Sequence, residues 1–374
     1  MKIVVVGGKA RSIMRHRGPL VRAMVQAGHD VVCTAPDNEL AMADQIPTVL
    51  GARFEPVALR RSSTNPLVDA RGVAELAALM RRESPDLVFS YTIKPVIYGS
   101  IAARIAGVPQ ITSLITGLGA GFIATNARQR ARRRVVTSLY QAALAVNHRI
   151  AFQNSDDAAL FLELGILPDL SRVEVVDGSG IDLDHFARQP LPPGPLKVLW
   201  LGRLLNDKGL IELVDAMRLL RELCPQVQLS VLGLFDDAQP ARLSREQVQG
   251  WHDDGLITFL GGTDDVRPYI AEAHVVALPS YREGIPRSLL EAMAIGRAIL
   301  TTDAPGCRHT VRDGVEGFVV PVGNPKAIAD AIARFDADPA LVERMADAAH
   351  ARARDTFAVD RINAAMFSAI GLTD

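Results

Sequence analysis

Short apolar runs alternate with longer amphipathic segments along this chain, and the alternation is interrupted once before it begins again. Alternation of this kind is typical of βα units, which assemble into a parallel sheet covered by helices. In the first half it predicts strands at 2–7, 30–34, 86–90, 109–115, 149–153 and 172–176, and helices at 18–27, 67–83, 97–106, 127–146 and 155–165. In the second half it predicts strands at 198–202, 227–233, 256–260, 274–278, 298–302 and 317–320. The pattern therefore predicts an α/β protein with two parallel sheets.

The interruption lies at residues 186–197, where four of the twelve residues are proline. Because proline stiffens the chain and cannot donate to a sheet, this stretch is predicted to connect two domains. A chain of 374 residues also exceeds the size at which one hydrophobic core keeps growing. We therefore expect two Rossmann-like domains, at 1–187 and 188–357, whose sheets face across a cleft at the carboxyl ends of their strands.

Composition limits the environment and the partners of the chain. No apolar run reaches the roughly 20 residues of a membrane-spanning helix, and the apolar start at 1–8 is too short for a signal peptide. Cys33, Cys224 and Cys307 are scattered without metal-ligand spacing, which fits a reducing cytoplasm. Residues 1–155 carry 20 Lys and Arg against 9 Asp and Glu, whereas the remainder carries 21 against 33. This segregation suggests an anionic partner or surface for the first half.

Two glutamates, Glu283 and Glu291, lie in the run Ser280–Gly296. Pro286 is suited to be the first residue of a helix, and Gly296 is suited to end it. Glu283 is then expected just before a helix N-terminus and Glu291 on the helix itself. A helix N-terminus binds anions through its free amides and its positive dipole end. With an acid at each edge to hold hydroxyls, this run indicates a nucleotide-sugar site.

The same run resembles the Glu-x7-Glu signature of the family 4 retaining glycosyltransferases, which have the GT-B architecture. Two other segments agree with that family: Leu201–Gly209, which matches its Gly-Arg-x4-Lys-Gly element, and Leu278–Ser280 directly before the first glutamate. The resemblance implies that 358–374 carries a final helix, over 358–371, that crosses back onto the first domain. It also implies a nucleotide-sugar donor, for which we expect UDP as the nucleotide and an N-acetylhexosamine as a candidate sugar.

The resemblance also implies roles for the donor-site residues. Arg203 and Lys208 would bind the phosphates and stabilise the departing nucleoside diphosphate, and Glu283 would hold the hydroxyls of the donor sugar. These three are the expected catalytic residues. The expected donor-binding residues are Gly8, Gly202, Ile285, Arg287, Ser288 and Glu291, of which Glu291 would hold the ribose. The glycines after the first strand do not form Gly-x-Gly-x-x-Gly, which argues against a dehydrogenase.

Two further segments, 90–99 and 115–122, resemble the subgroup that adds sugars to polyprenyl-diphosphate-linked acceptors during surface-glycan or glycoprotein-glycan assembly. By this resemblance Lys94 would pair with the acceptor diphosphate. The expected acceptor-binding residues are Arg17, Lys94, Thr116, Gly117 and Gly119. Many family members carry a histidine near Thr116, and this chain has none there, so no role is transferred from that histidine.

Five of the seven residues at 128–134 are arginine, and apolar and aromatic residues flank them. On a helix such a segment suits docking to an anionic membrane surface, although a solvated charged face is the plainer interpretation. Nucleic-acid binding is disfavoured because no recognition motif is present. The expected membrane residues are Phe122, Ile123, Arg128, Arg130, Arg132, Arg133 and Arg134, with shallow insertion of Phe122, Ile123, Val135, Val136 and Tyr140. We therefore expect a cytoplasmic protein bound peripherally to the inner face of the cell membrane.

Asp182 and Asp184 form an Asp-x-Asp, the metal-binding signature of the other major glycosyltransferase architecture. A single such match is weak, and we interpret it as structural. The sequence thus predicts a retaining glycosyltransferase, without metal or cofactor, that moves a sugar from a UDP-sugar to a lipid-linked glycan acceptor. Two alternatives stay open: a GT-B nucleotide-sugar epimerase or hydrolase, and a non-enzymatic nucleotide-sugar binding module.

Overall fold

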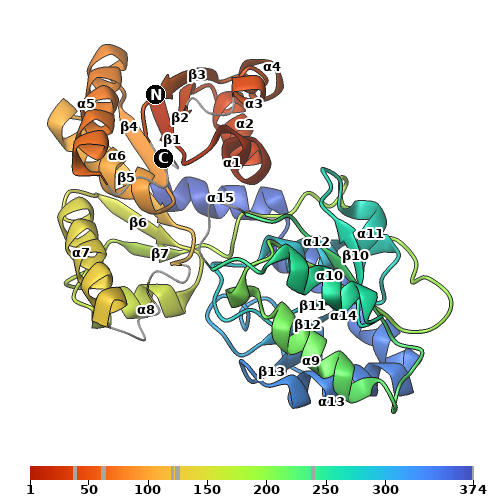
Figure 1. The fold of residues 1–374 in the computed structure, drawn as a ribbon. Coiled ribbons are helices and arrows are strands. Elements are labelled where there is room, and N and C mark those ends of the chain that lie inside the picture. The colour runs from red at the N-terminus through yellow and green to blue at the C-terminus, as the bar shows by residue number, and fades with distance from the viewer. Residues whose placement is uncertain (37–39, 60–64, 119–121, 123–126, 237–240, 373–374) are drawn as a thin grey trace. The chain divides into compact units, whose positions relative to one another are not determined.

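The computed structural model describes residues 1–36, 40–59, 65–118, 122, 127–236 and 241–372. The chain divides into two compact units, which comprise residues 1–179 with 360–374, and residues 180–359 (Figure 1). Each unit contains one parallel sheet with helices packed against it.

The first unit is built on a seven-stranded parallel sheet in the order β3-β2-β1-β4-β5-β6-β7. Its strands are β1 (Lys2–Val6), β2 (Asp30–Pro36), β3 (Arg53–Val57), β4 (Leu87–Tyr91), β5 (Gln110–Ile115), β6 (Arg149–Phe152) and β7 (Val173–Val175). Its helices are α1 (Ala10–Ser12), α2 (Gly18–Gln26), α3 (Leu40–Ala43), α4 (Ile46–Leu50), α5 (Pro66–Glu83), α6 (Ile93–Ala106), α7 (Ala127–Leu144), α8 (Ser155–Glu163) and α15 (Val359–Ile370).

Both faces of this sheet are buried, and β1 shows how. Ile3 and Val5 pack in one core cluster with residues of α2 and α15, whereas Val4 and Val6 pack in another with residues of α5 and α6. Successive side chains of a strand point to opposite faces, so a strand covered on both sides must be apolar throughout. This explains why the expected strands were visible as continuous apolar runs.

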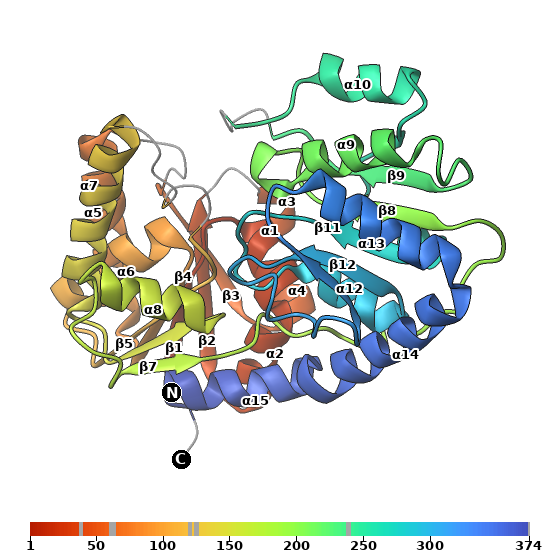
Figure 2. The same cartoon turned by 90° about the horizontal axis from the view of Figure 1, so that it is seen from below.

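The second unit repeats the plan with a six-stranded parallel sheet in the order β10-β9-β8-β11-β12-β13. Its strands are β8 (Lys197–Leu201), β9 (Gln228–Leu232), β10 (Thr258–Gly261), β11 (Val275–Leu278), β12 (Ala298–Thr302) and β13 (Gly317–Val320). Its helices are α9 (Leu210–Leu220), α10 (Arg245–Asp253), α11 (Arg267–Ala271), α12 (Arg287–Ile295), α13 (Pro325–Ala337) and α14 (Pro339–Thr356). Helix α9 packs against α13 and α12 packs against α14, on opposite faces of the sheet (Figure 2).

Several elements of the first unit were not predicted by the sequence pattern: the short helices α1, α3 and α4, strand β3 and a π-helical turn. Strand β3 was not expected, because its sequence Arg-Phe-Glu-Pro-Val mixes charged residues with proline. It lies at the edge of the sheet, where a missing N–H is tolerated. After β1, α1 leads into a π-helical turn over Ile13–Arg17, where the pattern indicated no regular element. Single π-helical turns are rare and frequently occur at functional sites.

The proline-rich stretch packs with the second unit. Phe186 and Leu196 belong to the core of that unit. The buried guanidinium of Arg297 donates hydrogen bonds to the carbonyl oxygens of Gln189 at 3.0 Å and Pro190 at 2.8 Å. The second unit therefore begins at residue 180, upstream of the boundary between 187 and 188 that the prolines suggested.

The last helix, α15, belongs to the first unit although it follows the second in sequence. Ile362 and Met366 join the core cluster that contains Ile3, and Arg149 Nη1 donates to the carbonyl oxygen of Ser368 at 3.3 Å. The resemblance implied a helix over 358–371, and α15 spans Val359–Ile370.

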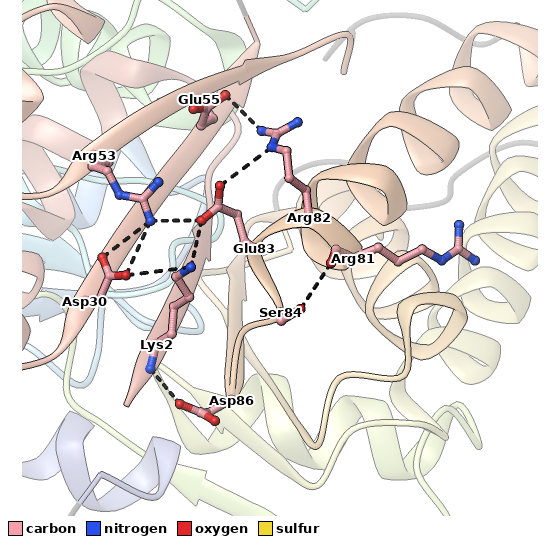
Figure 3. Close-up of polar contacts among 9 residues, drawn as sticks. All are labelled: Lys2, Asp30, Arg53, Glu55, Arg81, Arg82, Glu83, Ser84 and Asp86. Carbon is pink, nitrogen blue, oxygen red and sulfur yellow. Dashed lines mark hydrogen bonds and ion pairs between the residues drawn. The ribbon is translucent and has the colours of Figure 1, made fainter.

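Charged residues meet at the amino edge of the first sheet (Figure 3). The carboxylate of Glu83, at the end of α5, lies 2.9 Å from Arg53 Nη2 and 3.0 Å from Lys2 Nζ. Lys2 begins β1 and Arg53 begins β3, and Asp30, which begins β2, lies 3.4 Å from Arg53 Nη2. The hydrogen bond from Arg53 lowers the pKa of Glu83 to about 2. One buried acid thus ties the starts of two strands to the end of a helix.

Candidate functional site

The carboxyl edge of the second sheet carries the run that contains both glutamates. Helix α12 spans Arg287–Ile295, and Gly296 ends it in the left-handed conformation. The sequence predicted Pro286 as the first residue of the helix. It is instead the N-cap, with φ −70° and ψ 110°. The amides of Arg287 and Ser288, at the first two helical positions, have no acceptor within a helix, so this end of α12 is electropositive. Glu283 precedes the helix and Glu291 lies within it, as the sequence predicted.

Lys208 and Glu283, which are 75 residues apart in sequence, form an ion pair with Nζ and Oε1 separated by 2.5 Å. Their side chains are 12% and 17% exposed, respectively. Ser280 Oγ lies 3.0 Å from the same carboxylate oxygen. Lys208 ends a 3-10 turn over Asn206–Lys208. The pair therefore joins two loops at the ends of the adjacent strands β8 and β11.

The turn that carries Lys208 is fixed against its neighbours. Trp200 Nε1 donates to the carbonyl oxygen of Lys208 at 3.2 Å. Gly209 follows with φ +70°, and a Cβ at this position would lie 1.9 Å from the carbonyl oxygen of Pro279. Only glycine permits that approach in that conformation, so the last glycine of the Gly-Arg-x4-Lys-Gly element brings Lys208 to the loop of Glu283.

Arg203 follows β8 on the same edge, and its side chain is 48% exposed. Its Nη1 lies 3.2 Å from Asp236 Oδ2. Gly202 precedes it, and its carbonyl oxygen packs so closely on Gly233 that a Cβ there would lie 2.2 Å away. The structure thus brings Lys208 to Glu283, while Arg203 is paired with a separate carboxylate.

Glu291 forms an ion pair with Arg287 one turn earlier on α12, with Nε and Oε1 separated by 2.9 Å. The two side chains are 13% and 23% exposed. Ile285, expected to contribute a backbone amide, is buried in the loop before the helix. The expected donor-binding residues of α12 and its preceding loop therefore surround one helix N-terminus.

Two residues near this edge, Tyr281 and Cys307, were not predicted from the sequence. Tyr281 Oη donates to Glu212 Oε1 at 2.6 Å, and this bond raises the pKa of Tyr281 to about 12. Burial, reinforced by the charge of Glu283, raises the pKa of Cys307 to about 12. Tyr281 and Cys307 are ordinary loop residues by composition, so no local signal distinguished them.

In the first unit, the carboxyl ends of β1 and β4 meet around a buried arginine. Arg17 ends the π-helical turn and is 3% exposed, with its guanidinium 5.4 Å from the ring centroid of Tyr91. Gly7 and Gly8 follow β1, and a Cβ on Gly7 would lie 2.8 Å from Tyr91 Oη. Thr92, just before α6, has φ 69° and ψ 159°, a conformation that non-glycine residues rarely adopt. Such strained residues cluster at ligand-binding sites.

Lys94, on the first turn of α6, lies 2.7 Å from Asp69 Oδ1. Tyr98 Oη donates to Asp69 Oδ2 at 2.7 Å, so one carboxylate of α5 holds two side chains of α6. Thr116 and Gly117 follow β5 and are half-buried. Gly119, the remaining residue of the expected acceptor set, lies outside the described residues.

The structure corrects the expected insertion of aromatic residues into a membrane. Phe122 and Tyr140 are 5% and 1% exposed, and both pack on Phe161 in a core cluster. They therefore present almost no surface to a membrane. Val135 on α7 is 61% exposed. The exposed arginine positions of this helix are Arg130, Arg132 and Arg134, and Arg133 is partly exposed; Ile123 and the side chain of Arg128 lie outside the description.

Asp182 has a structural role in its loop. Its Oδ1 accepts hydrogen bonds from the backbone amides of Asp184 at 3.0 Å and His185 at 2.9 Å. Within the described part of the chain, no group of three or more His, Cys, Asp and Glu residues is arranged to hold a metal ion. None of the described helices combines the length and apolar character that a membrane span requires.

Comparison with known families accounts for most of the chain. Residues 2–154 match the family described as glycosyl transferase 4-like, and residues 195–338 match the family described as glycosyl transferases group 1. The two matches do not overlap, and between them they include β1 to β6 and β8 to β13.

Two curated relatives match over most of their length. An N,N'-diacetylbacillosaminyl-diphospho-undecaprenol alpha-1,3-N-acetylgalactosaminyltransferase of Campylobacter jejuni is 25% identical, over 91% of this chain and 91% of the relative. A UDP-Gal:alpha-D-GlcNAc-diphosphoundecaprenol alpha-1,3-galactosyltransferase of Escherichia coli is also 25% identical, over 80% of this chain and 78% of the relative. Among solved structures, Anabaena HepE in complex with UDP and glucose superposes with a TM-score of 0.80 at 19% identity, over the full length of both chains. This likeness shows that the fold is GT-B.

Proposed function

The chain belongs to the family 4 glycosyltransferases, and from this premise we propose that it transfers a sugar from a UDP-sugar to a sugar carried on a polyprenyl diphosphate. The observation that carries the proposal is the Lys208–Glu283 ion pair beside the N-terminus of α12. It combines a cation for phosphate with an acid for hydroxyls at one edge of one sheet. The names of the relatives from C. jejuni and E. coli support the class of acceptor, and an N-acetylhexosamine is the donor sugar that we expect.

In the proposed reaction, negative charge accumulates on the diphosphate as the bond to the sugar breaks. Lys208, Arg203 and the first amides of α12 would stabilise that charge with charge-assisted hydrogen bonds. The ammonium group of Lys208 has three N–H donors, so it can contact a phosphate oxygen while another donor remains on Glu283. Glu283 would bind hydroxyls of the donor sugar, and Glu291 would bind the ribose. The resemblance implies retention of configuration, with the donor phosphate accepting the proton of the acceptor.

The acceptor would bind in the first unit, at the carboxyl edge of its sheet. Lys94 and the N-terminus of α6 supply positive charge, and Thr116 and Gly117 follow the neighbouring strand. Arg17, buried beside Tyr91, would add to the positive potential of this edge. Because Lys94 is paired with Asp69, an acceptor diphosphate would compete with a carboxylate already in place.

The test of this function is a donor panel followed by transfer. Thermal stabilisation is measured with UDP-N-acetylgalactosamine, UDP-N-acetylglucosamine, UDP-galactose and UDP-glucose, because a ligand that binds the native state raises the melting temperature. The donor that stabilises is then incubated with a polyprenyl-diphosphate-linked sugar, and the product is analysed. Transfer with retained configuration is expected. An epimerised or hydrolysed donor without acceptor would favour the alternative enzyme class, and stabilisation without any product would favour a binding module.

We also propose that the arginines of α7 bind an anionic membrane surface. The helix Ala127–Leu144 contains no acidic residue, and its first half has no buried side chain among those described. Basic residues near an anionic leaflet contribute about 1 kcal/mol each. With Phe122 and Tyr140 buried, the attraction is expected to be mainly electrostatic, so it should weaken as salt shortens the Debye length from about 10 Å at 0.1 M to about 3 Å at 1 M.

Liposome co-sedimentation tests this partner. A variant with glutamine at four arginines should lose binding to anionic vesicles and turn over lipid-linked acceptor poorly, yet bind UDP normally; the positions are Arg130, Arg132, Arg133 and Arg134. The matched control removes four exposed charges from the second unit, at Arg218, Lys326, Arg344 and Arg354. Equal sedimentation of wild type and the first variant at low salt would identify the cluster as a solvated helix face.

A further inference from the structure

The turn Asp303–Arg308, which follows β12, packs directly against the loop that carries Glu283. Gly306 has φ +78°, and a Cβ at this position would lie 2.4 Å from the carbonyl oxygen of Glu283 and 2.3 Å from that of Gly284. Real Cβ atoms do not approach backbone oxygens so closely, and side chains rarely adopt this φ. Glycine at 306 is therefore a condition for the contact between the two loops.

Hydrogen bonds fix the contact at both ends of the acidic loop. The backbone amide of Glu283 donates to the carbonyl oxygen of Pro305 at 3.0 Å. The hydroxyl of Thr302 donates to the carbonyl oxygen of Ser280, and Cys307 Sγ lies 4.0 Å from the same oxygen. Because Ser280 Oγ in turn lies 3.0 Å from Glu283 Oε1, the last residue of β12 and the turn after it constrain both the backbone and the carboxylate of Glu283.

The turn itself is closed and buried where it makes these contacts. Arg308 Nε lies 2.7 Å from Asp303 Oδ1, and its Nη2 donates to the carbonyl oxygen of Asp303 at 2.9 Å. Thr302 and Cys307 are 0% exposed. At its first residue, the loop 279–284 is held by Gly209, whose hypothetical Cβ would lie 1.9 Å from the carbonyl oxygen of Pro279. Two left-handed glycines from two different turns therefore clamp one acidic loop.

We infer that the Asp303–Arg308 turn is a positioning element for Glu283 and that Gly306 is its positioning residue. The inference rests on the proposed role of Glu283 as the acid that binds the donor sugar. The Gly-Arg-x4-Lys-Gly element includes Gly209 at the start of the loop, whereas Gly306 at its end belongs to none of the motifs discussed above. A site held within about 0.5 Å by a rigid surrounding shell is what efficient transfer requires, and a displacement of about 1 Å can lower the rate by about 10²-fold.

The decisive variant is Gly306→Ala, with Gly314→Ala as its matched control. Gly314 has φ +75°, and a Cβ there would meet nothing within 4 Å, so the control carries the backbone strain without the collision. For Gly306→Ala we expect kcat/KM for the donor identified in the panel to fall about 10-fold to 10²-fold. Affinity for UDP alone should change less than about 3-fold, because the phosphates and the ribose are bound by other residues. The control should stay within about twofold of wild type.

A double-mutant cycle with Glu283→Gln tests whether Gly306 acts through that glutamate. If it does, Gly306→Ala should lower kcat/KM by less than about 3-fold in the Glu283→Gln background, because coupled residues are not additive. Full additivity of the two losses would overturn the inference while leaving the role of Glu283 intact. Normal turnover of Glu283→Gln alone would instead overturn the proposed role of Glu283, so the two failures are distinguishable.

Two further measurements keep the inference testable if Gly306→Ala folds poorly or no donor in the panel is turned over. Thr302→Val replaces the hydroxyl with a methyl group of nearly equal volume. It should lower kcat/KM as Gly306→Ala does, but by a smaller factor. Crystal structures of wild type and of either variant should show Glu283 Oε1 farther from Lys208 Nζ in the variant than in wild type. An unchanged distance in both variants would contradict the inference.

Discussion

Glu83 and Glu283 are both mostly buried carboxylates paired with a lysine, but they lie at opposite kinds of sheet edge. Glu83 lies at the amino edge of the first sheet, where Lys2, Arg53 and Arg82 approach it within 3.0, 2.9 and 3.7 Å (Figure 3). Its cations project from the first residues of strands and from a helix. Glu283 lies at the carboxyl edge of the second sheet, where Lys208 and Ser280 approach it from turns and loops.

The difference indicates which acid contributes to stability and which to chemistry. Around Glu83 the partners belong to regular elements, so breaking the network weakens the association of β1, β3 and α5. Around Glu283 the partners belong to loops that left-handed glycines hold in contact. Loops on a rigid scaffold are where binding and catalytic groups concentrate. We therefore expect substitutions at the amino edge to change the free energy of unfolding and substitutions at the carboxyl edge to change turnover.

The largest expected effect is on turnover at the carboxyl edge. Arg203→Ala and Lys208→Ala should each lower kcat by about 10²-fold or more, because both cations act on charge that develops in the transition state. The measurement is steady-state transfer by variants whose circular dichroism is native. Arg218→Ala is the matched control, since Arg218 is also 48% exposed and also pairs with one aspartate.

That control should leave kcat within about twofold of wild type, because an exposed ion pair contributes about 0–1 kcal/mol and Arg218 is not at the site. If Arg203→Ala and Lys208→Ala retain near-normal kcat while folded, the phosphate-binding role is wrong. The expectation that substitutions at the carboxyl edge change turnover would then be contradicted.

The next effect is on stability at the amino edge. Glu83→Gln should lower the free energy of unfolding at pH 7 by about 2–3 kcal/mol, as expected when a buried charged network loses its shared acid. Turnover should be unchanged, and urea unfolding with parallel transfer assays measures both. Glu55→Gln is the control, because Glu55 is 40% exposed and forms an exposed ion pair with Arg82; we expect a loss below about 1 kcal/mol. A large loss of kcat in Glu83→Gln would contradict the division between the edges.

A pH series sharpens this second prediction. The pKa of Glu83 is lowered in the folded state from its ordinary value of 4.5 to about 2. A carboxyl group with a depressed folded pKa stabilises the native state above its unfolded pKa, and this contribution is lost as pH falls toward the folded pKa. The stability difference between wild type and Glu83→Gln should therefore be full at pH 6 and shrink between pH 4.5 and 2. A difference that stays constant down to pH 3 would show that Glu83 acts by packing.

The sequence predicted the elements that depend on local pattern and missed those that depend on distant contacts. Parallel strands buried on both faces were visible because they are continuously apolar. β3 was not predicted because proline, here Pro56, is unfavourable within a strand. The edge position that tolerates this proline is set by tertiary structure, which the local sequence does not reveal. The proline-rich stretch read as a linker because the carbonyl-binding role of Arg297, about 100 residues downstream, leaves no local signal.

The same limit applies to the candidate site. The glutamates and the Gly-Arg-x4-Lys-Gly element were recognised by their spacing, which resembles a known signature. Gly306 reads as an ordinary turn glycine, and its contact with the carbonyl oxygen of Glu283 appears only when two loops are brought together by neighbouring strands. Phe122 and Tyr140 were misjudged because an aromatic residue beside arginines has the same sequence pattern whether it faces a membrane or a core.

The smallest expected effect is that of chelation on turnover. Both edges obtain their positive charge from side chains: the amino edge from Arg53 and Lys2, and the carboxyl edge from Lys208, Arg203 and the N-terminus of α12. If the groups of the carboxyl edge suffice to neutralise the diphosphate, the rate of transfer in excess EDTA should stay within about twofold of the untreated rate. Asp184→Asn should be equally harmless, because the Asp-x-Asp functions as a backbone turn in which Asp182 accepts two amide hydrogen bonds. Complete loss of turnover in EDTA, restored by Mn²⁺ or Mg²⁺, would show that a cation shares the diphosphate with Lys208 and would require a new account of this edge.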